Sequence, residues 1–328
     1  MKVIKVSGLH KSILHQTLAS RGIWRNCRFV LNDSNLKECD AWFVFDPDCL
    51  GGDNRCVCPE NMVYYIMGEP DCIRTYNKRF IKQFANVVGI QKKNYDVPKL
   101  IRNYWAMWFV GLSFETGIQK ANSKYDYDNL LNMDVPKKEK LISVVSSNKN
   151  FCEGHKKRLE FVERLKRHFG EKIDVYGRGI NPFDDKADVL VSYKYHIAIE
   201  NNVQDDYITE KLLDPFLTYT YPIYHGAKNV NEYFCNNSFT TIDINQPEKS
   251  IKIIEDVINS GKYEKSLKYL IESRDKVLNE YNLFDKMAVI ANQQESSNYI
   301  KTYVELNPES YYNYKRRLRK KIKKILNW

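Results

Sequence analysis

The sequence lacks the marks of a membrane-spanning or exported protein. It contains no run of the roughly 18 apolar residues that a spanning helix needs; "WAMWFVGL" at 105–112 comes closest and has the length of a core element. The amino terminus, "MKVIKVSGLHKS", reads as a strand and lacks the apolar run and small-residue cleavage site of a leader. We therefore expect a cytoplasmic protein that neither crosses a membrane nor enters the secretory route by itself.

The eight cysteines lack the dense, regular spacing of a small disulfide scaffold. Free thiols in a reducing compartment are the expected state. Cys49, Cys56, Cys58 and Cys72 could surround a zinc ion, but the C-x-C pair has no second pair at finger-like spacing. We expect scattered core and loop cysteines and no bound metal.

The positive charge is concentrated at the carboxyl end. The net charge is +10, and residues 315–328 contain eight Lys or Arg residues and no acid, which leaves +2 on the rest of the chain. Because the rest of the chain is nearly neutral, it has little long-range electrostatic field of its own. The basic tail therefore needs a separate explanation.

Strand-like and helix-like segments alternate in two series, and the sequence shows no short internal repeat. The first series includes "KVIKV", "AWFVF" and "MVYYIM", with the amphipathic "HKSILHQTLAS" between strands; the second runs from "LISVVSS" to "FTTIDI". Each is long enough for a sheet flanked by helices. We predict domains at 1–137 and 138–300 and a tail at 301–328, with Pro136 in the linker.

Polar residues follow several predicted strands, where open parallel α/β sheets bind ligands. Gly68-Glu69-Pro70 follows "MVYYIM", Ser146-Ser147-Asn148 follows "LISVV", Gly177-Arg178 follows "IDVY", Glu200-Asn201 follows "HIAI", and His225-Gly226 follows "YPIY". We expect these residues to line a site. For His225, contact with a ligand and a hydrogen-bonded structural role both remain open.

The densest group lies in "AIENNVQDDYITEKLLDPF" at 198–216. A helix is predicted from about residue 207, with Asp205 or Asp206 as its cap, and the amide groups of its first turn attract anions. Lys211 adds a formal charge suited to a diphosphate, and Arg158 and Arg178 are further candidates because a guanidinium matches phosphate oxygens. Glu210 is placed to address a sugar hydroxyl or a developing positive centre. This pattern predicts a site for a phosphorylated sugar donor.

The segment "YHIAIENN...DDYITEKLLDPFL...YPIYHGAKNV" resembles the donor-binding signature of the α-1,3-fucosyltransferases, including those of bacteria. In that family a strand ends in Glu-Asn, Tyr-(Ile or Val)-Thr-Glu-Lys follows, and Pro-(Ile or Val)-Tyr-x-Gly comes last. The strong likeness covers about thirty residues, and a weaker one extends over 141–242. The resemblance implies an α/β protein of the GT-B architecture, with two facing Rossmann-like domains and a cleft between them.

The resemblance also implies the reaction, an inverting transfer of L-fucose from GDP-fucose without a bound metal. Carried over by position, Asn201 and Tyr207 would contact the nucleotide, Glu210 the fucose, and Lys211 and Arg158 the diphosphate. Arg178 would be the basic residue that follows the family's Tyr-Gly.

The proton of the acceptor hydroxyl needs a base, and a carboxylate is the natural choice. We expect Glu69 to serve, because it follows a strand of the first domain and family members carry a glutamate in a similar setting before proline. Glu210 is the rival base, and a turn-stabilising role for Glu69 is the structural alternative.

The tail carries apolar residues at steps of three or four, from Tyr311 to Trp328, between its basic residues. This pattern predicts an interfacial helix that would hold the enzyme on the inner face of an anionic membrane, near a lipid-linked glycan. The alternative is a solvated tail that binds polyanions.

A nucleic-acid-binding protein is disfavoured, because the sequence has no zinc finger, homeodomain or aromatic-interleaved basic sheet. A transferase of the same build that uses another nucleotide sugar remains the main alternative.

Overall fold

The computed structural model describes residues 1–52, 54–92, 95–97, 99–103, 105–113, 119–146, 153–293 and 300–314. The chain divides into two compact units. Unit 1 comprises Met1–Leu14, Arg21–Trp105 and Phe284–Trp328, and unit 2 comprises His15–Ser20 and Ala106–Leu283. Residue 137, where the sequence predicts a linker, lies in unit 2 just before its first long strand.

Among the described residues of unit 1, seven strands form one sheet, in the order β2-β3-β1-β4-β6-β7-β8. All neighbouring strands of this sheet are parallel except β2, which is antiparallel to β3. Their bounds are β1 Lys2–Ser7, β2 Ile23–Trp24, β3 Cys27–Leu31, β4 Ala41–Val44, β6 Val63–Ile66, β7 Asn86–Val88 and β8 Lys99–Ile101. All residues of β4 and β6 are buried, as expected of a parallel sheet covered on both faces.

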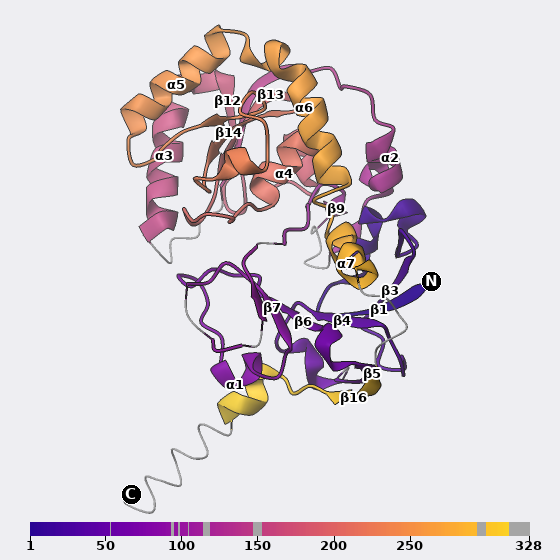
Figure 1. Ribbon diagram of the computed structural model, residues 1–328. Helices are drawn as coiled ribbons and strands as arrows, with labels where there is room; N and C mark the ends of the chain where they lie inside the picture. Colours follow the sequence, from indigo (N-terminus) through magenta and orange to yellow (C-terminus); the bar gives the residue numbers. More distant parts are fainter. Residues whose placement is uncertain are drawn as a thin grey trace, which may run out of the picture. The chain divides into compact units, whose positions relative to one another are not determined.

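The carboxyl-terminal segment returns to unit 1. Strand β16 (Lys301–Glu305) pairs antiparallel with β5 (Arg55–Pro59), and the two are labelled side by side in Figure 1. Leu306 completes this attachment by joining the buried core of unit 1. The helices of unit 1 include α1 (Lys78–Ile81) and α7 (Leu283–Asn292), whose first residue belongs to unit 2, and residues 309–314 are also helical.

In the part of unit 2 that the structure describes, five parallel strands form the main sheet, in the order β12-β11-β13-β14-β15. Their bounds are β11 Lys140–Val145, β12 Ile173–Tyr176, β13 Tyr193–Ile199, β14 Tyr221–His225 and β15 Thr240–Thr241. A small hairpin, β9 (Leu112–Ser113) with β10 (Lys120–Ala121), lies outside that sheet. Because the five strands are parallel, the residues that follow them share one edge of the sheet.

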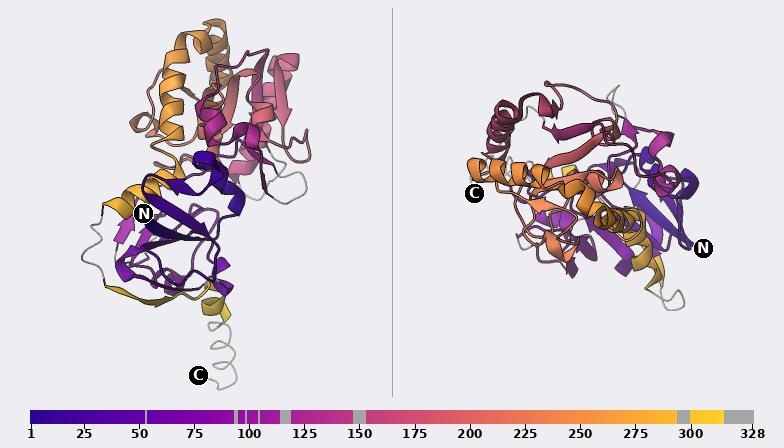
Figure 2. Two further views of the ribbon diagram at one scale, coloured as in Figure 1. Left: turned by 90° about the vertical axis from the view of Figure 1, so that its right-hand side faces the viewer. Right: turned by 90° about the horizontal axis from the view of Figure 1, so that it is seen from above.

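Five α-helices accompany the strands of unit 2 in its described part. They are α2 (Tyr127–Leu131), α3 (Glu153–Phe169), α4 (Glu210–Leu217), α5 (Pro247–Asn259) and α6 (Lys262–Leu278). Helix α3 contacts α5 and helix α4 contacts α6, and both views of Figure 2 show the orange helices α5 and α6 beside the sheet. Helix α4 follows β13 in the chain and contacts it.

Two local predictions were wrong. The amphipathic segment "HKSILHQTLAS" does not form an α-helix but the 3₁₀ turns Lys11–Gln16 and Leu18–Ser20, because Ala19 and Ser20 adopt left-handed backbone conformations that interrupt it. Helix α4 begins at Glu210 rather than near 207, and its cap is Thr209 and not Asp205 or Asp206.

Candidate donor-binding site

Glu200 ties the end of β13 to the start of α4. Its buried carboxylate accepts hydrogen bonds from the backbone N–H and the hydroxyl of Thr209, each at 2.9 Å. The Thr209 hydroxyl oxygen in turn accepts the backbone N–H of Lys211 at 3.3 Å, which makes it the helix cap. Burial raises the pKa of Glu200, and the hydrogen bonds from Thr209 with the charge of Lys211 oppose that rise.

Asp206 fixes the loop before the helix instead of capping it. Its carboxylate accepts the Asn229 side-chain amide at 2.8 Å and the Tyr233 hydroxyl at 2.6 Å. Its backbone is left-handed, with φ of 66°. This loop delivers Tyr207 and Thr209 to the carboxyl edge of the sheet.

Lys211 and Glu210 form the charged first turn of α4. The Lys211 ammonium group lies 3.0 Å from Glu210 Oε1 and 3.5 Å from Glu200 Oε2. Burial alone would raise the pKa of Glu210, but the charges of Lys211 and Lys186 outweigh it and lower that pKa to about 2. Glu210 is therefore a strongly ionised carboxylate at neutral pH.

Arg158 and Asn201, predicted from separate segments, are in contact. Arg158 lies on α3 with its side chain buried, and its Nη1 donates to Asn201 Oδ1 at 2.6 Å. Arg178 follows β12 at the same edge of the sheet and is exposed. Among the hydrogen bonds and ion pairs of the described residues, none connects Arg178 to the other five predicted donor residues. Of the Ser146–Asn148 segment, only Ser146 lies within the described residues.

Tyr207, Tyr224 and Gly226 pack closely beside Glu200. The Tyr224 hydroxyl donates to the Tyr207 carbonyl at 3.3 Å and accepts the Ala227 N–H at 3.0 Å. A β-carbon on residue 226 would lie 2.2 Å from that hydroxyl oxygen and 2.6 Å from Cγ of Glu200. Only glycine fits at position 226, which explains the Tyr-x-Gly spacing physically.

His225 is buried at the end of β14, where its Nδ1 lies 3.1 Å from the carbonyl oxygen of Ile242. Burial lowers its pKa. This geometry favours the structural role over ligand contact.

Glu69 follows β6 in unit 1 and is exposed. Its backbone is held on both sides: the Tyr76 hydroxyl oxygen accepts its N–H at 3.3 Å, and Gln91 donates to its carbonyl at 2.8 Å. The side chain thus extends from a fixed loop at the carboxyl edge of the unit 1 sheet.

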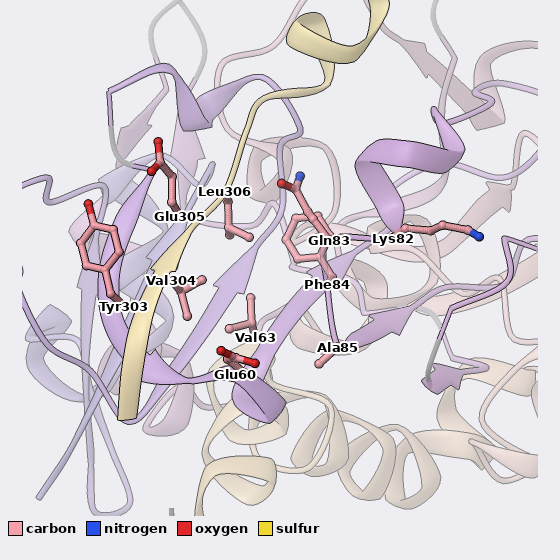
Figure 3. Close-up of a pocket in the computed structure, with 10 residues that line it drawn as sticks. All are labelled: Glu60, Val63, Lys82, Gln83, Phe84, Ala85, Tyr303, Val304, Glu305 and Leu306. Atoms are coloured by element: carbon pink, nitrogen blue, oxygen red, sulfur yellow. The ribbon is translucent and has the colours of Figure 1, made fainter. Parts of the chain in front are cut away.

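The hollows of unit 1 include two that are lined by described residues. One, of about 500 Å³, is lined by residues that follow β1, β3 and β4, including His10, Asn32 and Cys49, so it shares the carboxyl edge of the sheet with Glu69. The other, of about 380 Å³, lies between residues 82–85 and 303–306 and is drawn in Figure 3. Because it contains none of the predicted residues, we assign it no part in the site.

The described residues contain neither a metal-binding cluster nor a membrane-spanning helix. They include no group of three or more His, Cys, Asp or Glu side chains arranged to hold a metal ion. No helix among them has the length and apolarity needed to span a bilayer. The basic stretch 315–328 lies outside the described residues.

The structure adds Lys186 and Asp214 to the site. Both are buried, and their charged atoms are 2.8 Å apart beneath the first turn of α4. An aspartate within the apolar run "LLDPFL" is a sequence signal for a buried, paired charge. Lys186, in "DDKADVL", carries no comparable signal.

The fold resembles that of a solved enzyme. A crystal structure of an alpha1,3-fucosyltransferase with GDP-fucose aligns with 92% of this chain and 93% of its own, with a TM-score of 0.51 and 18% identity. With its two parallel α/β units, the chain is a protein of the GT-B glycosyltransferase fold.

One segment of the chain is similar to a glycosyltransferase family. The model of glycosyltransferase family 10 (fucosyltransferase), C-terminal part, matches residues 135–271. This segment is less than half of the chain, and its match confirms the resemblance to the α-1,3-fucosyltransferases seen in the sequence.

Curated relatives match part of the chain. GDP-fucose protein O-fucosyltransferase 3 of Danio rerio is 28% identical over 151 residues, 42% of this chain and 32% of that protein. The 4-galactosyl-N-acetylglucosaminide 3-alpha-L-fucosyltransferase 9 of Homo sapiens is 27% identical over 164 residues, 48% of this chain and 44% of that protein. The match thus spans from 32% to 44% of these relatives' length.

Proposed function

We propose that the chain transfers L-fucose from GDP-fucose to a hydroxyl group of an oligosaccharide acceptor, with inversion at the sugar carbon. One observation carries the proposal: within the family segment, buried Arg158 and the Lys211 turn of α4 stand at the carboxyl edge of a single parallel sheet. The names of the relatives support the sugar, since both are fucosyltransferases.

The donor would lie on unit 2. Lys211, Arg158 and the first amides of α4 provide positive charge for the diphosphate, so no bound metal is needed in this proposal. Asn201 and Tyr207 would contact the nucleotide, and Arg178 at the same edge could add a surface contact to the phosphates. Glu210 would face the fucose.

The reaction is a single displacement. The acceptor oxygen forms a bond to C1 of fucose while the bond from C1 to the diphosphate oxygen breaks, and that electron pair leaves with GDP. Cationic groups held in place before the reaction stabilise the charge that grows on the leaving diphosphate. Inversion of the β-linked donor gives an α-linked product.

Glu69 would accept the proton of the acceptor hydroxyl. A general base works best when its pKa is near the working pH, and the pKa of about 2 makes Glu210 a weak base. Glu210 is better suited to stabilise the positive charge that develops on the sugar. We therefore keep Glu69 as the base and place the acceptor on unit 1, where the 500 Å³ hollow shares its sheet edge.

The acceptor we favour is GlcNAc of an N-acetyllactosamine-like unit in a bacterial surface glycan, linked α-1,3. The name of the human relative supports this acceptor, whereas the zebrafish relative acts on protein by its name. Eight basic residues in 315–328, each worth about 1 kcal/mol near an anionic leaflet, would hold the enzyme on the inner face of the cytoplasmic membrane beside a lipid-linked, lipopolysaccharide-type acceptor. Truncation after Tyr314 should then abolish binding to anionic vesicles and leave GDP binding intact.

The deciding experiment incubates the purified chain and EDTA with individual GDP-sugars and a panel of glycan and peptide acceptors, followed by mass spectrometry of the products. Addition of a deoxyhexose to an N-acetyllactosamine acceptor supports the proposal. Transfer from another GDP-sugar alone would favour the same-fold alternative, and transfer to peptide alone would change the acceptor class.

A further inference from the structure

Lys186 is a buried lysine just behind the donor site. It begins the 3₁₀ turn Lys186–Val189, and its ammonium group lies 2.8 Å from Asp214 Oδ2 and donates to the Glu210 carbonyl oxygen at 3.3 Å. The Lys186 side chain is 8% exposed and that of Asp214 is fully buried. Removing two charges from water is expensive, so a buried pair that also reaches the helix start calls for a role other than stability.

The turn that carries Lys186 is itself fixed. Asp185 caps it, accepting the Ala187 N–H at 2.8 Å, and also accepts the Gly111 N–H at 3.0 Å and the Asn122 amide at 3.0 Å. On the other side, Asp214 accepts the Phe109 N–H at 2.8 Å. Lys186 therefore meets the first turn of α4 from a rigid support.

The charges around the start of α4 are unevenly matched. Three carboxylates face two ammonium groups: Glu200 at the end of β13, Glu210 and Asp214 on α4, with Lys211 on α4 and Lys186 on its turn. His196 on β13 hydrogen-bonds Ser143 at 2.8 Å, and burial with the charge of Lys186 lowers its pKa to about 3, so it adds no charge at neutral pH. Lys211 is at present shared between Glu210 and Glu200.

We propose that Lys186 is a positioning residue for the donor site. It fixes the first turn of α4, and its positive charge compensates the Glu210 carboxylate when the Lys211 ammonium group binds a nucleoside diphosphate. This inference rests on the proposed function for the roles of Glu210 and Lys211. Without Lys186, Glu210 would either hold Lys211 back from the diphosphate or take up a proton. Lys211 thus binds the donor, and Lys186 keeps the sugar-facing carboxylate of Glu210 ionised.

The test replaces the buried pair as a unit, Lys186→Met with Asp214→Asn, so that no lone charge remains in the core. Thermal unfolding first confirms a folded protein. The titration of Glu210 is then followed by ¹³C NMR of glutamate-labelled protein, assigned with Glu210→Gln. We expect the Glu210 pKa to rise, because Lys186 helps to lower it and the loss of a nearby opposite charge raises the pKa of a carboxyl group. The turnover number for GDP-fucose should fall about tenfold while GDP binds within about threefold of wild type.

The matched control is Lys138→Met, which removes a half-buried lysine of unit 2 whose ammonium group donates to Val191 O, Thr218 O and the Thr220 hydroxyl. It should lower stability without moving the Glu210 titration. A folded double variant with unchanged Glu210 titration and turnover would overturn the inference. Failure of the wild-type chain to transfer fucose would count against the proposed function instead, because the NMR titration does not depend on activity.

Discussion

The Tyr224 hydroxyl oxygen occupies the space in which residue 226 would carry a β-carbon, only 2.2 Å away. We predict that Gly226→Ala is destabilising. The added methyl group would clash with Tyr224 and the adjacent Glu200, which are both buried. Overpacking of this kind costs about 1–3 kcal/mol. Thermal unfolding and GDP titration should show a lower melting temperature and weakened GDP binding.

Gly51→Ala is the matched control, since a β-carbon there would meet nothing within 4 Å. If Gly226→Ala were as stable and bound GDP as well as this control, the close packing described here would be incorrect.

Arg158 and Lys211 should carry the affinity for the diphosphate. Arg158→Ala or Lys211→Ala removes a charge-assisted contact, worth about 1.5–3 kcal/mol, so GDP affinity measured by calorimetry should fall roughly tenfold or more. Asn201→Ala should have a smaller effect, because Asn201 accepts from Arg158 at 2.6 Å but carries no charge. Arg164 lies on the same helix as Arg158 and forms an exposed ion pair with Glu248 of α5, so Arg164→Ala should leave GDP affinity unchanged. Equal losses of affinity for Arg158→Ala and Arg164→Ala would argue against the site.

Glu69 should affect turnover and spare donor binding. Glu69→Gln keeps the size of the side chain but cannot accept a proton, so we expect turnover to fall about 10² to 10⁴-fold with GDP affinity unchanged. The exposed Glu272→Gln is the control. Normal turnover of Glu69→Gln in a product-formation assay would move the base to another residue.

His196 should make the fold sensitive to acid. Burial lowers its pKa from 6.5 to about 3, so between these values the unfolded chain binds a proton that the folded chain does not. Stability must therefore fall as pH falls through that window, by up to about 1.4 kcal/mol per pH unit from this group. Urea unfolding at pH 7, 5.5 and 4.5 should show a weaker pH dependence for His196→Gln than for wild type. Identical pH dependence would contradict the assignment, and the exposed His168→Gln should behave as wild type.

Much of unit 2 was predictable because its local signals agree. Buried strands such as "YHIAI" and "YPIYH" are continuous apolar runs that end in polar residues, and in a parallel sheet those ends meet at one edge. This rule predicts from the sequence alone that Asn201, Glu210 and Lys211 lie in one region. The contact between Arg158 and Asn201 lay beyond it, since it depends on where α3 packs.

The errors have local physical causes. Asp205 and Asp206 are good helix caps by residue type, but Glu200 holds Thr209 in the capping position, and Asp206 finds stronger partners in Asn229 and Tyr233. The segment after β1 has a helical apolar period, yet the left-handed Ala19 ends it. Lys186 could not be found, because a lysine in a polar turn gives no sequence sign that the fold will bury it.

The most direct measurement is a crystal structure of the chain with GDP. The account predicts the diphosphate within hydrogen-bonding distance of Arg158 and Lys211, at the first turn of α4, with Lys211 moved away from Glu210. GDP bound away from both residues would contradict the account.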